Sequence, residues 1–179
     1  MKEKHMDALQ CLYSRVSTRD FNDKPVSSAD VAEIVRAAGA APVGMCRYAD
    51  KHLTVVKNEA FFKAVTAKTP QVEGRREAPF YGARTLIVVS SKLSDAPAIE
   101  YADAACIVYA MALAARAKNV ASVYLWGFLK TVRADEKLLA ALDLPEGYSP
   151  LSALAIGYTD EELKLSDAPR HTLSLNEVD

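Results

Sequence analysis

The run Ala104–Ala115 constrains the fold most, because its twelve residues include no charged side chain. Apolar residues recur along it at the three- and four-residue spacing of one helix face, and its other sides are largely apolar too. We therefore expect a buried helix over residues 97–118. Its many alanines let another stretch of backbone approach closely. That stretch belongs either to the core of a monomer or to a partner subunit, and the sequence leaves both alternatives open. The run is shorter than the about 20 apolar residues of a membrane span, since it is bounded by Glu100, Asp103, Arg116 and Lys118.

The chain has the size and composition of one cytoplasmic domain, residues 1–179. Its net charge of -1 and its pI near 6.3 provide no basic field for nucleic acid or acidic lipid. The N-terminus lacks the continuous apolar segment of a secretory signal. The three cysteines are odd in number and widely separated, so we expect reduced thiols. The histidines lack ligand spacing, so we expect no metal. Because there is no basic field and no apolar run of spanning length, we expect no nucleic-acid and no membrane partner.

The segment from Arg15 to Phe21 is a candidate anion site. Its β-branched residues disfavour helix, and an extended segment places Arg15, Ser17 and Arg19 on one face. Two guanidinium groups beside a hydroxyl suit a phosphate, because each guanidinium makes paired charge-assisted hydrogen bonds. The alternative is a solvated polar face.

The remaining segments predict an α+β domain with a mixed central sheet of four to five strands flanked by helices. A polar stretch, 66–84, is expected to be a loop and a candidate lid over an active site. No glycine-rich phosphate loop, nucleophile turn or carboxylate pair stands out, so no catalytic side chain is predicted. The expected helices cover residues 4–14, 28–38, 59–65 and 138–142, and the expected strands 52–57, 85–90, 120–125, 151–158 and 173–178.

Several segments together resemble the flavin-dependent nitroreductase family over nearly the whole chain. Any one of them is weak, but their order along the chain is fairly specific. They are Arg-Val-Ser-Thr-Arg-Asp-Phe at 15–21 with Lys-Pro-Val at 24–26, Ala-Pro-Val-Gly-Met at 41–45, Pro-Phe-Tyr-Gly-Ala at 79–83, Tyr-Leu-Trp-Gly at 124–127 and Ser-Ala-Leu-Ala-Ile-Gly-Tyr at 152–158.

The resemblance implies a homodimer that binds flavin mononucleotide (FMN) at the subunit interface. Such an enzyme passes hydride from NADH or NADPH to a nitroaromatic, quinone or similar acceptor, and nicotinamide and acceptor use one face in turn, which gives ping-pong kinetics. A second hypothesis is a flavin-binding protein without efficient turnover, for storage or sensing. A third is an α+β domain that binds another anion.

The resemblance also assigns roles to residues. Arg15 and Ser17 match positions that hold the flavin phosphate and ribityl chain, and Arg19 matches one at the pyrimidine edge of the ring. Gly127 matches a backbone contact at the ring's N5 edge, beside Trp126, which would narrow access to the ring. The turn that lies against the flavin from the other subunit matches Pro42, Val43 and Gly44.

The C-terminal tail, residues 159–179, is expected to reach the partner subunit. There Arg170 completes the phosphate site, and the alternating Leu173 and Leu175 lock the dimer by adding to a sheet edge. The alternative is a disordered polar tail. One departure from the family is Cys46, which stands where many members have Asn. We interpret Cys46 as a packed or rim cysteine rather than as a catalytic thiol.

Overall fold

The structure is a computed structural model that describes residues 6–70, 79–94 and 98–178. Its centre is a four-stranded sheet in the order β1-β2-β4-β3, in which each neighbouring pair is antiparallel. The two inner strands, β2 and β4, are apolar and almost wholly buried, as expected for strands covered on both faces. The strands are β1 (Lys51–Val56), β2 (Thr85–Lys92), β3 (Ala121–Leu125) and β4 (Tyr148–Gly157).

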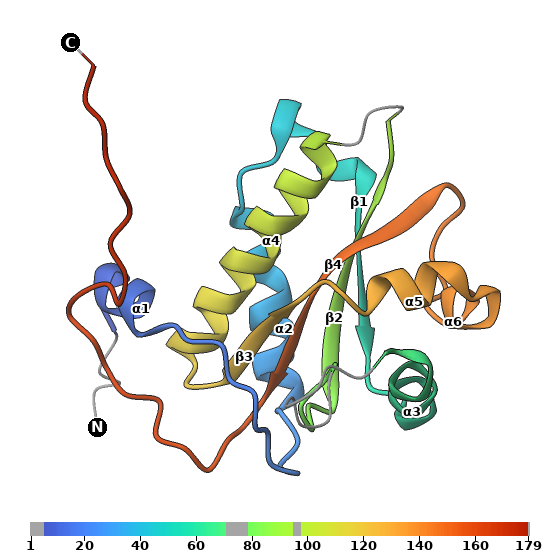
Figure 1. The fold of residues 1–179 in the computed structure, drawn as a ribbon, viewed down its shortest axis with the longest axis horizontal. Helices are drawn as coiled ribbons and strands as arrows, with labels where there is room; N and C mark the ends of the chain where they lie inside the picture. The colour runs from blue at the N-terminus through green and yellow to red at the C-terminus, as the bar shows by residue number, and fades with distance from the viewer. Residues whose placement is uncertain (1–5, 71–78, 95–97, 179) are drawn as a thin grey trace.

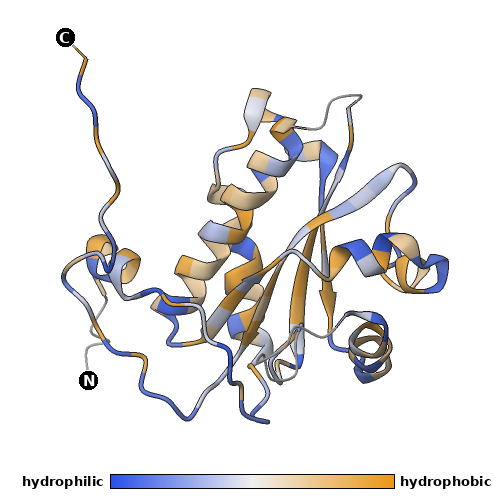
Figure 2. Cartoon of the chain, viewed as in Figure 1, coloured by the Kyte–Doolittle hydropathy of each residue, from blue (hydrophilic) through white to orange (hydrophobic). Residues whose placement is uncertain are grey.

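Helices cover both faces of the sheet (Figure 1). On one face lie α2 (Ser28–Ala37) and α4 (Ala98–Ala117), and on the other lie α3 (Glu59–Lys68), α5 (Leu129–Ala134) and α6 (Glu136–Ala140). A shorter helix, α1 (Ala8–Ser14), packs against α4. Figure 2 shows the central parts of the strands in the colours of hydrophobic residues between these layers. Three short 3₁₀ turns connect α2 to β1, namely Ala38–Ala40, Gly44–Cys46 and Tyr48–Asp50.

Polar side chains fix where several helices begin. Ser27 precedes α2 and its hydroxyl accepts a hydrogen bond from the Asp30 N–H, as the sequence predicts. Asn58 caps α3 in the same way through the N–H groups of Ala60 and Phe61. These caps satisfy N–H groups that the first helical turn leaves without partners.

The predicted central helix is confirmed as α4, which packs against α2 and the strands β2, β3 and β4. Length and composition alone would allow the 20 residues of α4 to cross a membrane. The short length of the uncharged run is therefore not sufficient to exclude a membrane span. However, 44% of its most apolar window is buried inside the protein, and Asp103 and Arg116 make polar contacts there. We therefore interpret α4 as the core helix of this domain.

The α+β class and the four-stranded sheet are confirmed, with differences in detail. Among the described residues, parallel pairing is limited to an isolated bridge between Ser17 and Ser122, because the four strands themselves are antiparallel. The expected strand at 173–178 is wrong, since these residues are exposed and lie away from the sheet (Figure 1). Helix α5 was not predicted. The expected loop begins later than position 66, because α3 continues to Lys68, and residues 71–78 of it lie outside the described residues.

Candidate functional site

The candidate anion segment is extended and is fastened to the sheet by its backbone. Ser17 bridges Ser122 of β3, and the Thr18 N–H donates to the Ser122 carbonyl at 2.9 Å. The Thr18 side chain is buried, whereas those of Ser17 and Arg19 are exposed. The alternation of an extended segment therefore turns Ser17 and Arg19 outward, as the sequence predicts.

Phe21 anchors the end of this segment in a slot between two glycines. A Cβ on Gly157 would lie 2.7 Å from the Phe21 Cδ1 atom, and a Cβ on Gly82 would lie 2.8 Å from the Phe21 carbonyl oxygen. Gly82 also has a φ of +85°, a conformation that residues with a side chain rarely adopt. The Phe21 N–H donates to the Tyr81 carbonyl at 3.0 Å. Both glycines are thus required for Phe21 to hold the segment in place.

Two hollows adjoin the segment. The first, about 490 Å³, lies between Arg15, Ser17 and the exposed side of α4, where Cys106 and Tyr109 line it. The second, about 690 Å³, is lined by Arg15, Ser17 and Arg19 together with Arg170 and His171 of the tail. Arg15, Ser17, Arg19 and Arg170, the candidate anion-binding residues, thus lie around one hollow of a single chain, with His171 beside Arg170. The expectation that Arg170 reaches the partner subunit's site stays a prediction.

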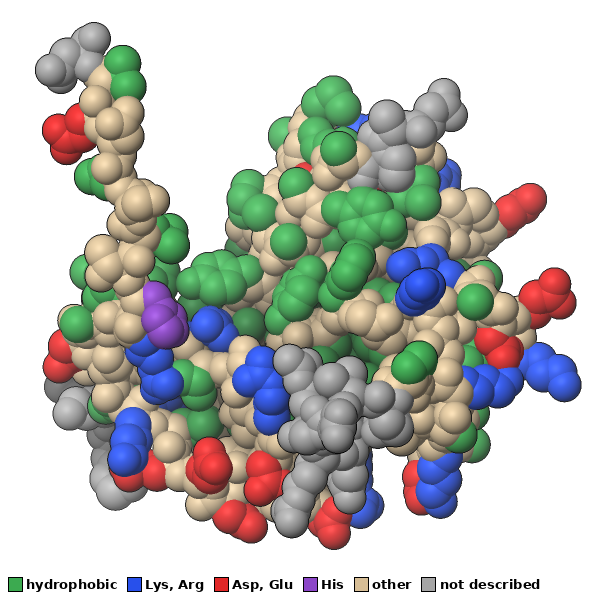
Figure 3. Space-filling model, in the orientation of Figure 1, with side chains coloured by type: hydrophobic (Ala, Val, Ile, Leu, Met, Phe, Trp, Pro, Cys, Tyr) green, Lys and Arg blue, Asp and Glu red, His purple; other side chains and the backbone are tan. Residues whose placement is uncertain are grey.

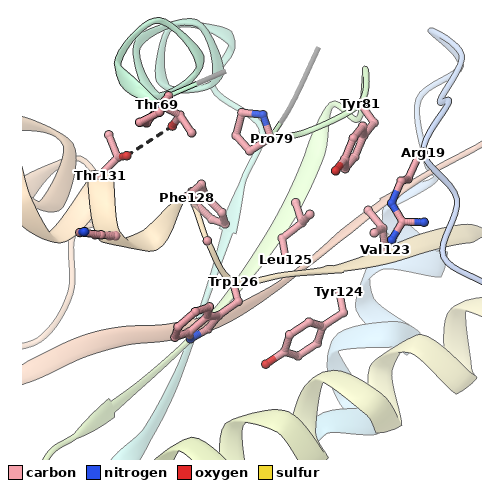
Figure 4. Close-up of a pocket in the computed structure, with 13 residues that line it drawn as sticks. Arg19, Thr69, Pro79, Tyr81, Val123, Tyr124, Leu125, Trp126, Phe128 and Thr131 are labelled. Carbon is pink, nitrogen blue, oxygen red and sulfur yellow. Dashed lines mark hydrogen bonds between the residues drawn. The ribbon is translucent and has the colours of Figure 1, made fainter. Parts of the chain in front are cut away.

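A third hollow, about 420 Å³, lies at the C-terminal end of β3 (Figure 4). Arg19 stands on one side of it, and Trp126 and Gly127 lie where β3 turns toward α5. Tyr124 lines both this hollow and the first one, and its hydroxyl lies 2.9 Å from the buried Ser152 Oγ. A Cβ on Gly127 would meet nothing within 4 Å, so no contact within the described part of this chain requires a bare backbone there.

The charges that line the three hollows are all of one sign. Within the described part of the chain, no carboxylate lines any of them. A concave surface with unneutralised cations favours anionic ligands. The cations are Arg15, Arg19, Lys130 and Arg170, with the titratable His171 beside them.

The predicted turn Pro42–Gly44 lies apart from these hollows, at the N-terminal end of α4. Gly44 packs so closely that a Cβ on it would stand 2.2 Å from the Ile99 Cδ1 atom. Its N–H donates to Asp103 Oδ1 at 2.8 Å, and the next two residues, Met45 and Cys46, both have positive φ. Within one chain the turn does not meet Arg15, so its contact with a ligand across a subunit interface stays a prediction.

A group of buried charges holds this turn, and the sequence analysis did not identify it. Lys51 Nζ lies 2.9 Å from Asp103 Oδ2, and both side chains are less than one-tenth exposed. Burial raises the pKa of Asp103, but the Gly44 N–H and the Lys51 ammonium together hold that pKa below its ordinary value. Glu100 lies one turn earlier, accepts from the Ser94 N–H at 3.2 Å, and is 1% exposed. Asp103 and Glu100 lie at the spacing of the buried face of α4, and this spacing is the sequence signal that could have identified them.

Arg116, near the other end of α4, ties the start of the tail to the domain. Its guanidinium donates to the Leu163 carbonyl at 2.8 Å, and burial lowers its pKa. The Ser166 N–H donates to the buried Ser14 Oγ at 2.8 Å. The tail therefore leaves the domain from a fixed point between α1 and α4, before it reaches Arg170.

The cysteines lie in three different environments. Cys46 is exposed in the turn after Gly44, Cys106 lines the first hollow, and Cys11 is buried with its Sγ 3.3 Å from the Leu113 carbonyl oxygen. Burial raises the pKa of Cys11, which keeps it a thiol. Among the described residues, no group of three or more His, Cys, Asp or Glu side chains has the geometry of a metal site.

Comparisons with known proteins show the family of this chain and solved structures with a similar fold. A model of the nitroreductase family matches residues 12–158. A protein of Archaeoglobus fulgidus, provisionally named NADH dehydrogenase/NAD(P)H nitroreductase, is 25% identical over 163 residues, which is 90% of this chain and 91% of that protein. The fold is similar to a nitroreductase with bound FMN from Desulfitobacterium hafniense (TM-score 0.78, 24% identity, 96% of this chain and 97% of that one). It is also similar to one with bound FMN from Bacteroides fragilis (TM-score 0.74, 24% identity, 96% of this chain and all of that one).

Proposed function

Because the chain belongs to the nitroreductase family, we propose that it is an FMN-dependent oxidoreductase. In this proposal NADH or NADPH is the electron donor, and a nitroaromatic, quinone or similar compound is the acceptor. The observation that carries it is the set of adjoining hollows lined by cations and by no carboxylate among the described residues. FMN carries a phosphate, and its ring becomes anionic on reduction, so both ends of it suit such a surface.

The residues present fit FMN. Arg15 and Ser17 supply a guanidinium and a hydroxyl for the phosphate and ribityl chain, from a segment that β3 and Phe21 hold in place. Arg19 stands between the second and third hollows, where a cation stabilises negative charge on the pyrimidine edge. Gly127 leaves the space above its backbone open for the ring's N5 edge. FMN, when bound, supplies the hydride chemistry, so the side chains need only position and stabilise it.

A homodimer is part of the proposal, because one chain leaves two apolar surfaces uncovered. The outer side of α4 exposes Ile99, Ala102, Ala105, Cys106 and Tyr109, and Figure 3 shows hydrophobic side chains gathered on this side. Leu173, Leu175 and Val178 of the tail are each more than 80% exposed. A second copy would cover both surfaces and would bring its Pro42–Gly44 turn toward the first chain's cations.

Removing residues 168–179 tests the dimer and the role of Arg170 together. This deletion keeps the contacts of Arg116 and Ser14, so the domain itself should still fold. We expect light scattering to show dissociation toward the monomer and bound flavin to fall. A matched variant, Arg170→Ala, should lose flavin and stay dimeric. A deletion variant that stays dimeric and fully yellow would contradict both roles.

The spectrum of the purified protein tests the cofactor and the activity. We expect a yellow protein whose flavin absorbance bleaches anaerobically on addition of NADH or NADPH. A yellow protein that does not bleach would favour flavin storage or sensing without turnover. A colourless protein that takes up no added FMN would contradict both hypotheses and favour another anion.

Steady-state kinetics test whether donor and acceptor share one site. In this proposal Arg19 and Gly127 hold the flavin ring at the third hollow, and nicotinamide and acceptor use the same open face of that ring in turn. We therefore expect parallel lines in double-reciprocal plots, as in ping-pong kinetics. Intersecting lines would indicate a ternary complex and a second binding pocket.

A further inference from the structure

Tyr124 lies where the first and third hollows meet. Within the described part of the chain, it is the one residue that lines both of them, and its side chain is 45% exposed. The proposed function places the flavin phosphate and ribityl chain beside Arg15 and Ser17 in the first hollow. It places the flavin ring beside Arg19 and Gly127 in the third. An FMN molecule that spans the two hollows must therefore pass Tyr124.

A buried serine holds the hydroxyl group of Tyr124. Ser152 lies on β4, the strand that pairs with β3, and is 1% exposed. Its Oγ atom lies 2.9 Å from the Tyr124 hydroxyl oxygen. The tyrosine side chain is thus fixed at both ends, by the backbone of β3 and by Ser152, although almost half of it faces solvent.

Burial determines the direction of this hydrogen bond. At 2.9 Å either oxygen could donate. Ser152 Oγ has no second hydrogen-bond partner among the described residues, so its proton would be buried without an acceptor if Tyr124 were the donor. If Ser152 donates instead, the buried proton is paired and the Tyr124 O–H proton is left for the open side. The second arrangement is more stable, because an unpaired buried donor loses its hydrogen bonds to water. Tyr124 therefore offers a hydrogen-bond donor to a ligand.

The position of this hydroxyl group decides which part of FMN it meets. The hydrogen-bond acceptors of the flavin ring lie at its pyrimidine and N5 edges, which the proposed function assigns to Arg19 and Gly127. Figure 4 shows the Tyr124 hydroxyl group pointing away from Arg19. The ribityl chain joins the ring to the phosphate and carries hydroxyl groups, which accept hydrogen bonds. The chain is therefore the part of FMN that suits a donor at the junction of the two hollows.

We infer that the Tyr124 hydroxyl group donates a hydrogen bond to the ribityl chain of bound FMN, and that Ser152 is a positioning residue that acts through Tyr124. The inference rests on the proposed function and adds a contact between the phosphate and ring ends of the cofactor. Such a contact restricts the chain between its two fixed ends, and both oxygens of the relay are already in place before FMN binds.

Flavin titration tests the contact. Tyr124→Phe removes the hydroxyl group and keeps the ring. We expect its affinity for FMN, measured by fluorescence with the flavin-free protein, to fall about three- to tenfold, the loss of one neutral hydrogen bond. Tyr101→Phe, which removes a hydroxyl group on α4 outside the three hollows, is the matched control and should leave the affinity unchanged. Unchanged affinity in Tyr124→Phe overturns the inference.

Two flavins that differ from FMN identify the part that Tyr124 contacts. Riboflavin keeps the ribityl chain and lacks the phosphate, so Tyr124→Phe should weaken its binding by the same factor as that of FMN. Lumiflavin has a methyl group in place of the chain, so its binding should not change. A loss for FMN without a loss for riboflavin would place the hydroxyl group at the phosphate, and an equal loss for lumiflavin would place it at the ring. Either result overturns the inference.

A double-mutant cycle tests the role of Ser152. Ser152→Ala keeps the Tyr124 hydroxyl group but removes the group that orients it, so FMN affinity should fall. In Tyr124→Phe the same serine substitution should cause no further fall, because the hydroxyl group it orients is absent. A serine that serves only the packing of β4 would lower affinity by the same factor in both backgrounds, which would overturn its positioning role.

These titrations need no electron donor, so they are independent of turnover. A protein that shows the expected loss in Tyr124→Phe but does not bleach with NADH or NADPH would contradict the proposed activity alone. A protein that bleaches, and whose Tyr124→Phe variant binds FMN as tightly as the wild type, would contradict this inference alone.

Discussion

Two groups of charged side chains lie beside different parts of α4, and they differ in what neutralises them. The closed group, Lys51 with Asp103 and Glu100, is buried, and Lys51 and Asp103 pair at 2.9 Å. The open group, Arg15, Arg19 and Arg170, lines solvent-filled hollows with no described carboxylate. Paired charge that is removed from water holds one conformation, whereas unpaired charge that faces water is available to a ligand. The contrast separates residues that support the site from residues that contact its ligand.

The largest effect should come from breaking the closed group. Asp103→Ala leaves the Lys51 ammonium buried without its partner and removes the acceptor of the Gly44 N–H. We expect the free energy of unfolding to fall by about 3 to 5 kcal/mol, measured by urea denaturation. The double variant Lys51→Met/Asp103→Leu, which removes both charges, should recover most of this loss. A loss below about 1 kcal/mol in the single variant would show that the pair is not closed.

Breaking the open group should change binding and leave folding intact. Arg15→Ala removes a charge-assisted contact to the FMN phosphate, which should cost about 1.5 to 3 kcal/mol, or about one to two decades in affinity. Flavin titration followed by fluorescence measures this. Arg36→Ala, an exposed arginine of α2 outside the hollows, is the control. Unchanged affinity in Arg15→Ala would place the phosphate elsewhere.

Acid should weaken the closed group, and this pH dependence should distinguish it from the open group. The pKa of Asp103 is lowered in the folded protein, so its stabilisation is present above the unfolded-state pKa of about 3.8 and is lost as the pH falls through the lower folded value. Asp103→Asn keeps an acceptor for Gly44 but does not titrate. The difference in unfolding free energy between wild type and this variant should therefore shrink from pH 6 to pH 3. A difference independent of pH would contradict a charged Asp103.

The smallest effect should come from a pair that is neither buried nor near the hollows. Arg84 and Asp23 form an ion pair, but their side chains are 67% and 86% exposed. Water screens such a pair, so Arg84→Ala should change the unfolding free energy by less than about 0.5 kcal/mol in the same urea assay. A loss comparable to that of Asp103→Ala would show that burial does not govern the contrast.

Patterns local in sequence predicted most of the fold. The uncharged run predicted α4 and the continuous apolar segment from Thr85 predicted β2, because a segment without charged side chains is recognisable from composition alone. Helix α5 was missed because it has six residues and Phe128 provides no side-chain cap. Strand direction was missed because the two-residue alternation of a strand is the same in both directions. The tail strand was wrong because a strand needs a neighbour, which one chain does not provide.

The predictions for the site divide in the same way, into residues of one short segment that were predicted and contacts between distant residues that were missed. Arg15, Ser17 and Arg19 were predicted from spacing, since they share one short extended segment. The pairing of Lys51 with Asp103 joins residues far apart in the chain, so no local pattern predicted the pair, although Asp103 lies at the core spacing of α4.

The slot around Phe21 links positions that are distant in the chain. Its ring leaves no room for a Cβ at Gly157, so a side chain at 157 requires a smaller residue at 21. The reverse change, a small residue at 21 with glycine kept at 157, opens a cavity where the ring now packs. Each single substitution should therefore be costly, and the double substitution should cost less than the sum of the two single ones. Among relatives, the residues at positions 21 and 157 should therefore change together, because together they set where the anion-binding segment lies.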